Sequence, residues 1–204
     1  MLSQIRPAVV LLALFTLLTG LAYPLAITGI AQLAMPYQAN GSLLSVGDKP
    51  VGSALIGQNF ASDKYFHSRP SATQAQDPAH PDDPTKTIDA PYNAANSTGS
   101  NLGPTSQKLI DRVKADVEAK RAAGWTGPIP ADSVTTSASG LDPHISPENA
   151  LAQVAAVAKA RGLPEDKVRA LVATNTQGRF LGLIGEPRVN VLRLNMALDA
   201  ASAS

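Results

Sequence analysis

The chain has 204 residues, of which 17 are Lys or Arg and 16 are Asp or Glu, so its formal net charge is +1. This balance argues against a nucleic-acid-binding protein, which usually carries a basic excess or stripe, and the absence of cysteine excludes a disulfide framework. Aromatic residues make up 4% of the chain, so we expect a core built largely from Leu, Ile, Val and Ala.

Residues 8–35, from Ala8 to Met35, form an uncharged apolar stretch that predicts one transmembrane helix. As a helix it would reach roughly 42 Å, which exceeds the roughly 30 Å hydrocarbon core of a bilayer. Pro24 removes a helix hydrogen bond near the middle and predicts a kink. A lone helix cannot enclose an aqueous channel, so the chain is expected to anchor a domain and to serve transport only with partners.

The alternative is a cleaved signal peptide, with Arg6 as its basic region and Val9–Leu18 as its apolar region. No strict Ala-x-Ala site follows that region. The looser sites Gly20–Ala22 and Gly29–Ala31 lie inside continuing apolar sequence, which favours the membrane span.

Charge near the span predicts its orientation. Arg6 precedes it, whereas the first charges beyond it are the offsetting pair Asp48 and Lys49. The positive-inside rule therefore places a short tail, residues 1–7, in the cytoplasm and residues 36–204 outside it.

Residues 36–204 are predicted to form a single soluble domain of mixed α/β, or α+β, class. Short apolar runs with Gly breaks in Gly41–Phe66, such as Ser53–Gln58, predict short strands. Residues 68–104 are rich in Pro, Ser, Asn and Asp, and such a composition buries little apolar surface. They are therefore expected to form a long polar loop, a feature that is often functional.

Capping and stop residues predict three helices in the remainder of the chain. Thr105 or Ser106 can cap the first, Gly124 stops it, and Ser146 followed by Pro147 starts the second. The three are expected at about residues 106–123, 147–161 and 165–174. Two strands are predicted after them, at Phe180–Ile184 and Arg188–Leu194.

Catalytic patterns are weak. Ser137, Ser139, Asp142 and His144 crowd one short stretch, but a working triad needs groups that can reach one another in order. We interpret the stretch as a capped turn before the helix at Ser146, and no residue is assigned a catalytic role.

Metal and phosphate patterns are also weak. The three histidines are scattered, and His80 among the acidic residues of 77–83 lacks the ligand spacing of a zinc site, so no metal site is assigned. The turn Gly99–Thr105 enters a helix and could offer backbone N–H groups to an anion. It lacks the lysine of a P-loop, and Pro104 removes one donor.

Five strings resemble, in chain order, the C subunit of the Kdp potassium-transporting ATPase. They are LIGQ at 55–58, YFHSRPSA at 65–72, STGSNLGPT at 97–105, SASGLDPHISP at 137–147 and GEPRVNVLRLN at 185–195. The resemblance implies a non-catalytic accessory subunit of a bacterial inner-membrane complex that imports potassium at the expense of ATP. Its expected partners are a potassium-selective channel-like subunit, a P-type ATPase subunit, a small hydrophobic subunit and membrane lipid.

In that family the C subunit is described as a catalytic chaperone that raises the affinity of the ATPase subunit for ATP. Nucleotide contacts are attributed to a serine-glycine stretch and a downstream glutamine, which fall here on Ser137, Ser139, Gly140 and Gln153. ATP is accordingly the expected cofactor of the complex, and potassium is the transported ion.

The predicted topology is in tension with this nucleotide role, because it places the domain in the periplasm, where ATP is scarce. Gln153 has no basic residue beside it in the sequence. Lys159 and Arg161 lie further along the same predicted helix. A second hypothesis is a structural or gating subunit that caps the outer mouth of the potassium-selective subunit without binding ATP. Its candidate contact residues are Gly99, Asn101, Gly103 and Thr105. An unrelated exported binding domain is a third, more distant alternative.

Overall fold

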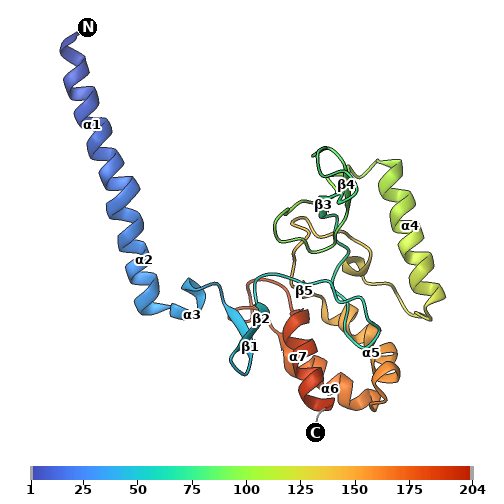
Figure 1. The fold of residues 1–204 in the computed structure, drawn as a ribbon. Helices are drawn as coiled ribbons and strands as arrows, with labels where there is room; N and C mark the ends of the chain where they lie inside the picture. Colours follow the sequence, from blue (N-terminus) through green and yellow to red (C-terminus); the bar gives the residue numbers. More distant parts are fainter. Residues whose placement is uncertain (1, 203–204) are drawn as a thin grey trace. The chain divides into compact units, whose positions relative to one another are not determined.

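The computed structural model of the chain describes residues 2–202. The chain divides into two compact units, one ending at Ser53 and the other beginning at Ala54 (Figure 1). Helices and short antiparallel strands follow one another along the chain, as the predicted α+β class requires.

The first unit begins with the apolar helix. After a short turn, η1 (Leu2–Gln4), helical turns run through α1 (Ile5–Leu17), the π-helical turn η2 (Leu18–Ala22) and α2 (Tyr23–Ala34). This 30-residue helix has a mean hydropathy of 2.2 in its most apolar window, where no residue is buried. It is long and apolar enough to cross a bilayer. It begins at Ile5 rather than Ala8 and ends at Ala34 rather than Met35.

Pro24 lies in the first turn of α2, directly after η2. Having no N–H, it cannot bond to the carbonyl of Gly20, and its ring crowds that carbonyl. A widened π turn is a common local adjustment to such a break. The interruption that proline imposes on this helix therefore takes the form of a π-helical turn.

A hairpin follows the short helix α3 (Pro36–Ala39). Its strands β1 (Leu43–Val46) and β2 (Lys49–Ser53) are antiparallel and joined through Gly47, which has a positive φ of 59°. The prediction of strands here is confirmed for these two, but it is wrong for the rest of Ser53–Gln58. Gly57 instead donates its N–H to Leu141 O at 2.8 Å, so this run packs against the segment before β5 and does not pair with a strand.

Residues 68–104 are mostly irregular, with one small hairpin that composition did not predict. It pairs β3 (Gln74–Gln76) with β4 (Thr87–Asp89). The segment contributes almost no apolar side chains to the core. It is held together instead by hydrogen bonds from its polar side chains to its own backbone. The Thr73 hydroxyl donates to Ala90 O at 2.6 Å, and the Asn93 amide donates to Gln74 O at 2.7 Å.

All three predicted helices are present. They are α4 (Gln107–Ala122), α5 (Pro147–Arg161) and α6 (Glu165–Asn175), and a short 3-10 turn, η3 (Ala131–Ser133), lies between the first two. Gly162 ends α5 in the left-handed conformation, at φ 65°, which a side chain rarely adopts.

The two strands predicted near the C-terminus are largely wrong. Phe180–Ile184 is a turn closed by one isolated bridge, and only Arg188–Asn190 of the second is a strand, β7. The next element is a helix, α7 (Val191–Ser202). Its buried residues at 191, 194, 195 and 198 follow helical spacing, and the β-branched valines before it obscured that period.

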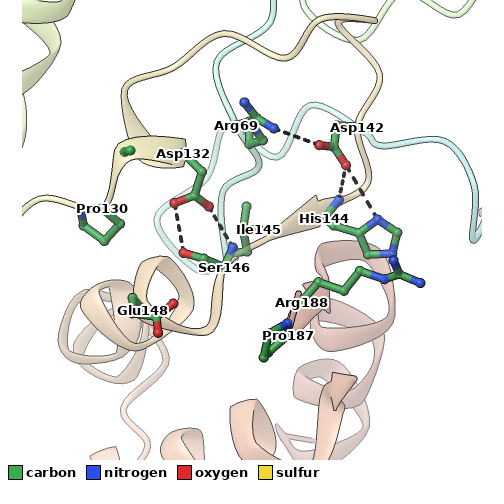
Figure 2. A pocket seen from close by; sticks show the side chains of 11 residues that line it. Arg69, Pro130, Asp132, Asp142, His144, Ile145, Ser146, Glu148, Pro187 and Arg188 are labelled. Atoms are coloured by element: carbon green, nitrogen blue, oxygen red, sulfur yellow. Dashed lines mark hydrogen bonds and ion pairs between the residues drawn. The ribbon is translucent and has the colours of Figure 1, made fainter. Parts of the chain in front are cut away.

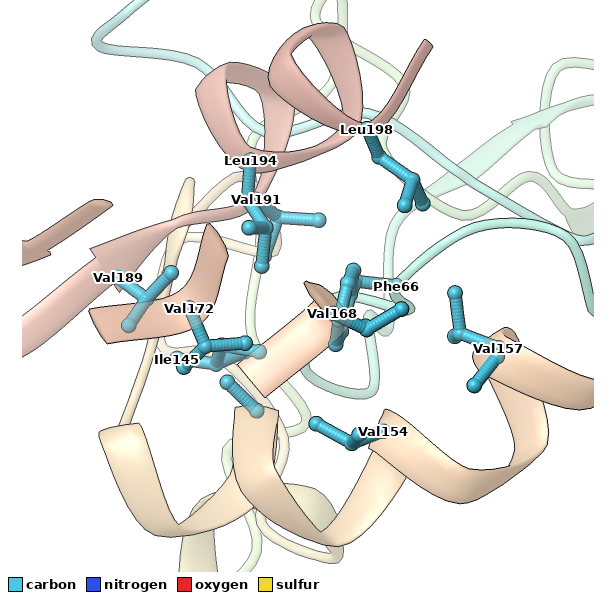
Figure 3. Close-up of a cluster of buried hydrophobic side chains, with 12 residues drawn as sticks. Phe66, Ile145, Val154, Val157, Val168, Val172, Val189, Val191, Leu194 and Leu198 are labelled. Carbon is cyan, nitrogen blue, oxygen red and sulfur yellow. The ribbon is translucent and has the colours of Figure 1, made fainter. Parts of the chain in front are cut away.

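The second unit packs α5, α6 and α7 around a small sheet. β5 (His144–Ile145), β7 and β6 (Thr176–Gln177) lie in that order and are antiparallel. Figure 3 shows the core between these elements, which is largely aliphatic, as the composition predicted; among residues 2–202, Phe66 is the one aromatic residue within the buried cluster, and the partly buried Phe60 packs against it. The core residues are Phe66, Ile145, Ala150, Val154, Val157, Ala158, Val168, Val172, Val189, Val191, Leu194 and Leu198.

Candidate functional site

A cavity of about 480 Å³ lies beside β5 and the start of α5, and charges of both signs line it (Figure 2). It contains Asp142 and His144, the titratable members of the crowded stretch that sequence analysis singled out. Its other charged residues are Arg69, Asp132, Glu148 and Arg188.

Asp142 is the centre of one hydrogen-bonded network in this cavity. Its carboxylate accepts a bond from Arg69 Nη1 at 3.0 Å and from the His144 backbone N–H at 3.0 Å. The His144 ring nitrogen Nδ1 lies 3.6 Å from the same carboxylate. Partial burial raises the pKa of Asp142, but the hydrogen bonds from His144 and Arg69 outweigh it, so the pKa lies below its usual value.

Asp132 is the centre of a second network. It accepts from the Ser146 N–H at 2.7 Å, the Ser146 hydroxyl at 2.9 Å and the Asn149 amide at 3.0 Å. Ser146 in turn accepts from the Asn149 N–H and caps α5, as predicted. Both aspartates of the cavity are therefore used by neighbouring groups, which is typical of a structural ion-pair and capping network.

The serine-glycine stretch forms a tight turn. Ser137 is buried, and its hydroxyl accepts from the Asp142 N–H at 3.3 Å, while the Ser139 hydroxyl accepts from the Leu141 N–H at 3.1 Å. Gly140 has a φ of 70°, and a Cβ there would lie 2.7 Å from Thr98 O and closer still to a Thr73 methyl. Hydroxyls bonded to nearby backbone and a left-handed glycine are ordinary turn chemistry.

Ser139, in contrast, is exposed beside a depression of about 500 Å³. Arg69 lines the same depression and supplies a cation that sequence reasoning missed. It missed Arg69 because it searched for basic residues along the chain near Gln153, whereas Arg69 comes from a distant segment. The only sequence signal was its presence in one of the five family-like strings.

Gln153 is buried, with 7% of its surface exposed, and both the nitrogen and the oxygen of its amide are hydrogen-bonded. The side-chain oxygen accepts from the His67 N–H at 2.7 Å, and the nitrogen donates to His67 O at 3.1 Å and to Asn149 Oδ1 at 3.0 Å. Gln153 lines a separate cavity of about 130 Å³ that contains none of Ser137, Ser139 and Gly140. The structure therefore brings the three members of the stretch together but not Gln153.

Asn195 makes the same contact one residue earlier. Its oxygen accepts from the Phe66 N–H at 2.9 Å, and its nitrogen donates to Phe66 O at 3.0 Å. Sequence reasoning gave Asn195 no role. The available signal was a polar residue at a core position of a helix, where an unpaired amide would be costly.

The candidate contact residues in the turn Gly99–Thr105 differ in burial: one is packed against the domain and three are exposed. Gly99 lies against the serine-glycine stretch, since a Cβ there would be 2.6 Å from Ala138 O. Asn101, Gly103 and Thr105 are exposed, and Asn101 has a positive φ of 51°. Across residues 2–202, no three His, Asp or Glu side chains are grouped so as to hold a metal ion.

Comparison with known proteins identifies the family. A family model described as KdpC, the c chain of the K⁺-transporting ATPase, matches residues 5–200. The chain is 64% identical over 203 residues to the potassium-transporting ATPase KdpC subunit of Bradyrhizobium diazoefficiens, with 100% of both chains covered. The KdpC subunits of Rhodopseudomonas palustris strain BisB5 and Methylobacterium nodulans are 62% and 63% identical, with 99% and 98% of both chains covered. The chain belongs to the KdpC family.

KdpC membership confirms the resemblance seen in the five sequence strings. It makes the chain a subunit of a K⁺-transporting ATPase, a membrane transport system whose transported ion is potassium. Because KdpC is described as the c chain of this ATPase, the complex is implied to have other subunits. The apolar helix Ile5–Ala34 is a candidate for the membrane-spanning part of this subunit.

Proposed function

We propose that this chain is a non-catalytic accessory subunit needed for assembly of an ATP-driven potassium import complex, and that it acts through protein contacts instead of holding a nucleotide itself. The observation that carries the proposal is the double hydrogen bond between the Gln153 amide and the His67 backbone. Both N–H groups of this amide are donated and its oxygen already accepts the His67 N–H, so contact with a nucleotide through its nitrogen would require breaking these bonds.

The proposed arrangement is a single pass through a bacterial inner membrane. Arg6 lies before the apolar helix and the balanced pair Asp48 and Lys49 after it, which favours a cytoplasmic N-terminus, residues 1–7, and a periplasmic domain, residues 36–204. On that side the domain can meet the outer mouth of the potassium-selective subunit. The long polar loop at 68–104, with Gly99, Asn101, Gly103 and Thr105, is the proposed contact surface, since loops commonly carry binding.

The second candidate is the catalytic chaperone that raises the affinity of the ATPase subunit for ATP in a ternary complex. One observation favours it: the exposed Ser139 lies beside a depression that Arg69 also lines, a pairing that could meet a phosphate. Against it, Arg69 already pairs with Asp142 at 3.0 Å, and Ser137 is buried.

ATP binding by the purified full chain in detergent separates the two candidates. If the chain acts only through protein contacts, we expect no saturable ATP binding, and we expect the other subunits to fail to assemble in cells that lack the chain. Saturable binding that is lost on Ser139→Ala would instead establish the nucleotide role. Ser139→Ala is preferable to a Gln153 variant because Ser139 is exposed and Gln153 holds the fold together.

A further inference from the structure

The turn Phe180–Ile184 exposes four large apolar side chains in five residues. Their exposed fractions run from 66% at Ile184 to 80% at Leu183. Other large apolar residues exposed in the second unit occur singly, such as Ile88, Ile110 and Leu151, or as the adjacent pair Leu55 and Ile56. Single exposed apolar residues are ordinary, whereas a contiguous group on a soluble surface usually marks a contact site.

Two backbone hydrogen bonds and an ion pair close the turn. Phe180 and Ile184 exchange backbone hydrogen bonds at 2.8 and 3.0 Å, and Arg179 and Glu186 form an ion pair at 2.7 Å at its base. Beyond the base, β6 pairs with β7, and Val189 of β7 is fully buried in the core. Leu181 is held at φ 52°, a conformation that costs roughly 1–2 kcal/mol for a side-chain-bearing residue. A preformed shape lowers the entropy cost of docking into a partner of fixed shape.

We propose that this apolar turn inserts into an apolar pocket on another subunit of the potassium-transporting ATPase. The inference deepens the proposed assembly role and rests on it. It names the segment of this chain that acts as the anchor and the chemistry of its receptor: a concave apolar surface with a polar rim that faces Arg179, Glu186 and Arg188.

Two other occupants fit less well. Four side chains of this size present on the order of 500 Å² of apolar surface, whereas a stable dimer needs about 800 Å² from each partner, so the turn is too small to hold a second copy by itself. A turn that enters lipid gains from a cluster of free basic residues that meet anionic headgroups, but here Glu186 offsets Arg179 and Arg188 alone supplies a net positive charge beside the turn. In a contact between unlike subunits the turn can be the buried centre of a larger interface. It then needs neither the full area of a stable dimer nor free basic residues.

Photo-crosslinking in native membranes tests this assignment directly. A benzophenone amino acid is placed at Leu181 or Leu183 of the full chain, co-expressed with the other pump subunits, and at Ile110 of α4 as the control. We expect ultraviolet-dependent adducts with a pump subunit, identified by mass spectrometry, from the two turn positions and none from the control. Adducts with lipid alone, adducts with a second copy of this chain, or no adduct from either turn position would each overturn the proposal.

Substitution gives an independent readout. Leu183→Asp is expected to lower the amount of this chain recovered with an affinity-tagged pump subunit at least about tenfold, whereas Ile110→Asp leaves recovery unchanged. Both side chains are exposed, so both variants should melt at the wild-type temperature. Wild-type recovery for Leu183→Asp would refute the anchor while leaving the assembly role intact. Failure of the wild-type chain to copurify would refute both.

Discussion

Two buried side-chain amides hold the backbone of consecutive residues much as a neighbouring strand would. Asn195 pairs with both backbone groups of Phe66, and Gln153 pairs with both of His67. Phe66 is thereby fixed in the core although its own segment belongs to no strand. Buried backbone groups need such partners, because leaving a buried donor or acceptor without one destabilises the fold by more than a typical hydrogen bond stabilises it.

Replacing Gln153 by Leu should therefore weaken the fold. The change leaves the His67 N–H and carbonyl without their partner, and we expect a loss of about 2 kcal/mol in unfolding free energy. Denaturant unfolding of the full chain in detergent measures it. Gln107→Leu is the matched control, since Gln107 makes only an exposed bond to Asp111 within α4 and its loss should cost a few tenths of a kcal/mol. Equal stability of the two variants would contradict the structural role of Gln153.

Gly140 and Gly103 offer a second matched pair. A Cβ at Gly140 would meet Thr98 O at 2.7 Å, at a φ of 70°, whereas a Cβ at Gly103 would meet nothing within 4 Å. Gly140→Ala should destabilise the domain by about 2 kcal/mol or more, and Gly103→Ala by less than about 0.5 kcal/mol. Thermal melting of both variants tests the difference, and a tolerated Gly140→Ala would show that the serine-glycine turn can relax.

Helix starts were the most predictable elements, because a cap depends on residues close in sequence. Ser146 before Pro147 marked the beginning of α5, and Gly162 marked its end. Ser106 precedes α4 in the same extended conformation, but its side chain makes no capping bond. The strand predicted at Arg188–Leu194 failed for the opposite reason: β-branched residues favour strands locally, while burial against α6 decides that the chain turns helical at Val191.

The two serines give a prediction that isolates capping. Ser146→Ala removes a bond to the Asn149 N–H and one to Asp132, and should cost about 1–2 kcal/mol of stability. Ser106→Ala should change stability by less than about 0.5 kcal/mol, because no capping bond is lost. Chemical unfolding of both variants provides the measurement. A larger effect at Ser106 than at Ser146 would contradict the capping assignment.

The chain as a whole combines an apolar helix with a domain in which basic and acidic residues balance. Net charge therefore does not favour one class of partner. The proposed single-pass topology is testable because the chain has no cysteine. Ala95→Cys and Ala155→Cys, both at exposed positions, should react with a membrane-impermeant thiol reagent in cells with a permeabilised outer membrane. Ser3→Cys is the control and should react only after the inner membrane is opened. Protection of Ala95→Cys and Ala155→Cys until that point would place the domain in the cytoplasm and favour direct nucleotide delivery.

Local sequence was enough for the apolar helix, the three amphipathic or capped helices and the family, since each depends on composition, spacing or strings of adjacent residues. The pairing of Arg69 with Asp142, the burial of Gln153 and the helical fate of Val191 depend on residues far apart in the chain. Only the tertiary structure decided these, because long-range packing fixes which polar groups meet, and local propensity is too weak to oppose it. The same holds for the apolar turn at Phe180–Ile184. Its residues suit a strand, but within residues 2–202 Phe180 and Ile184 pair only with each other and with no named strand, and the side chains stay on the surface.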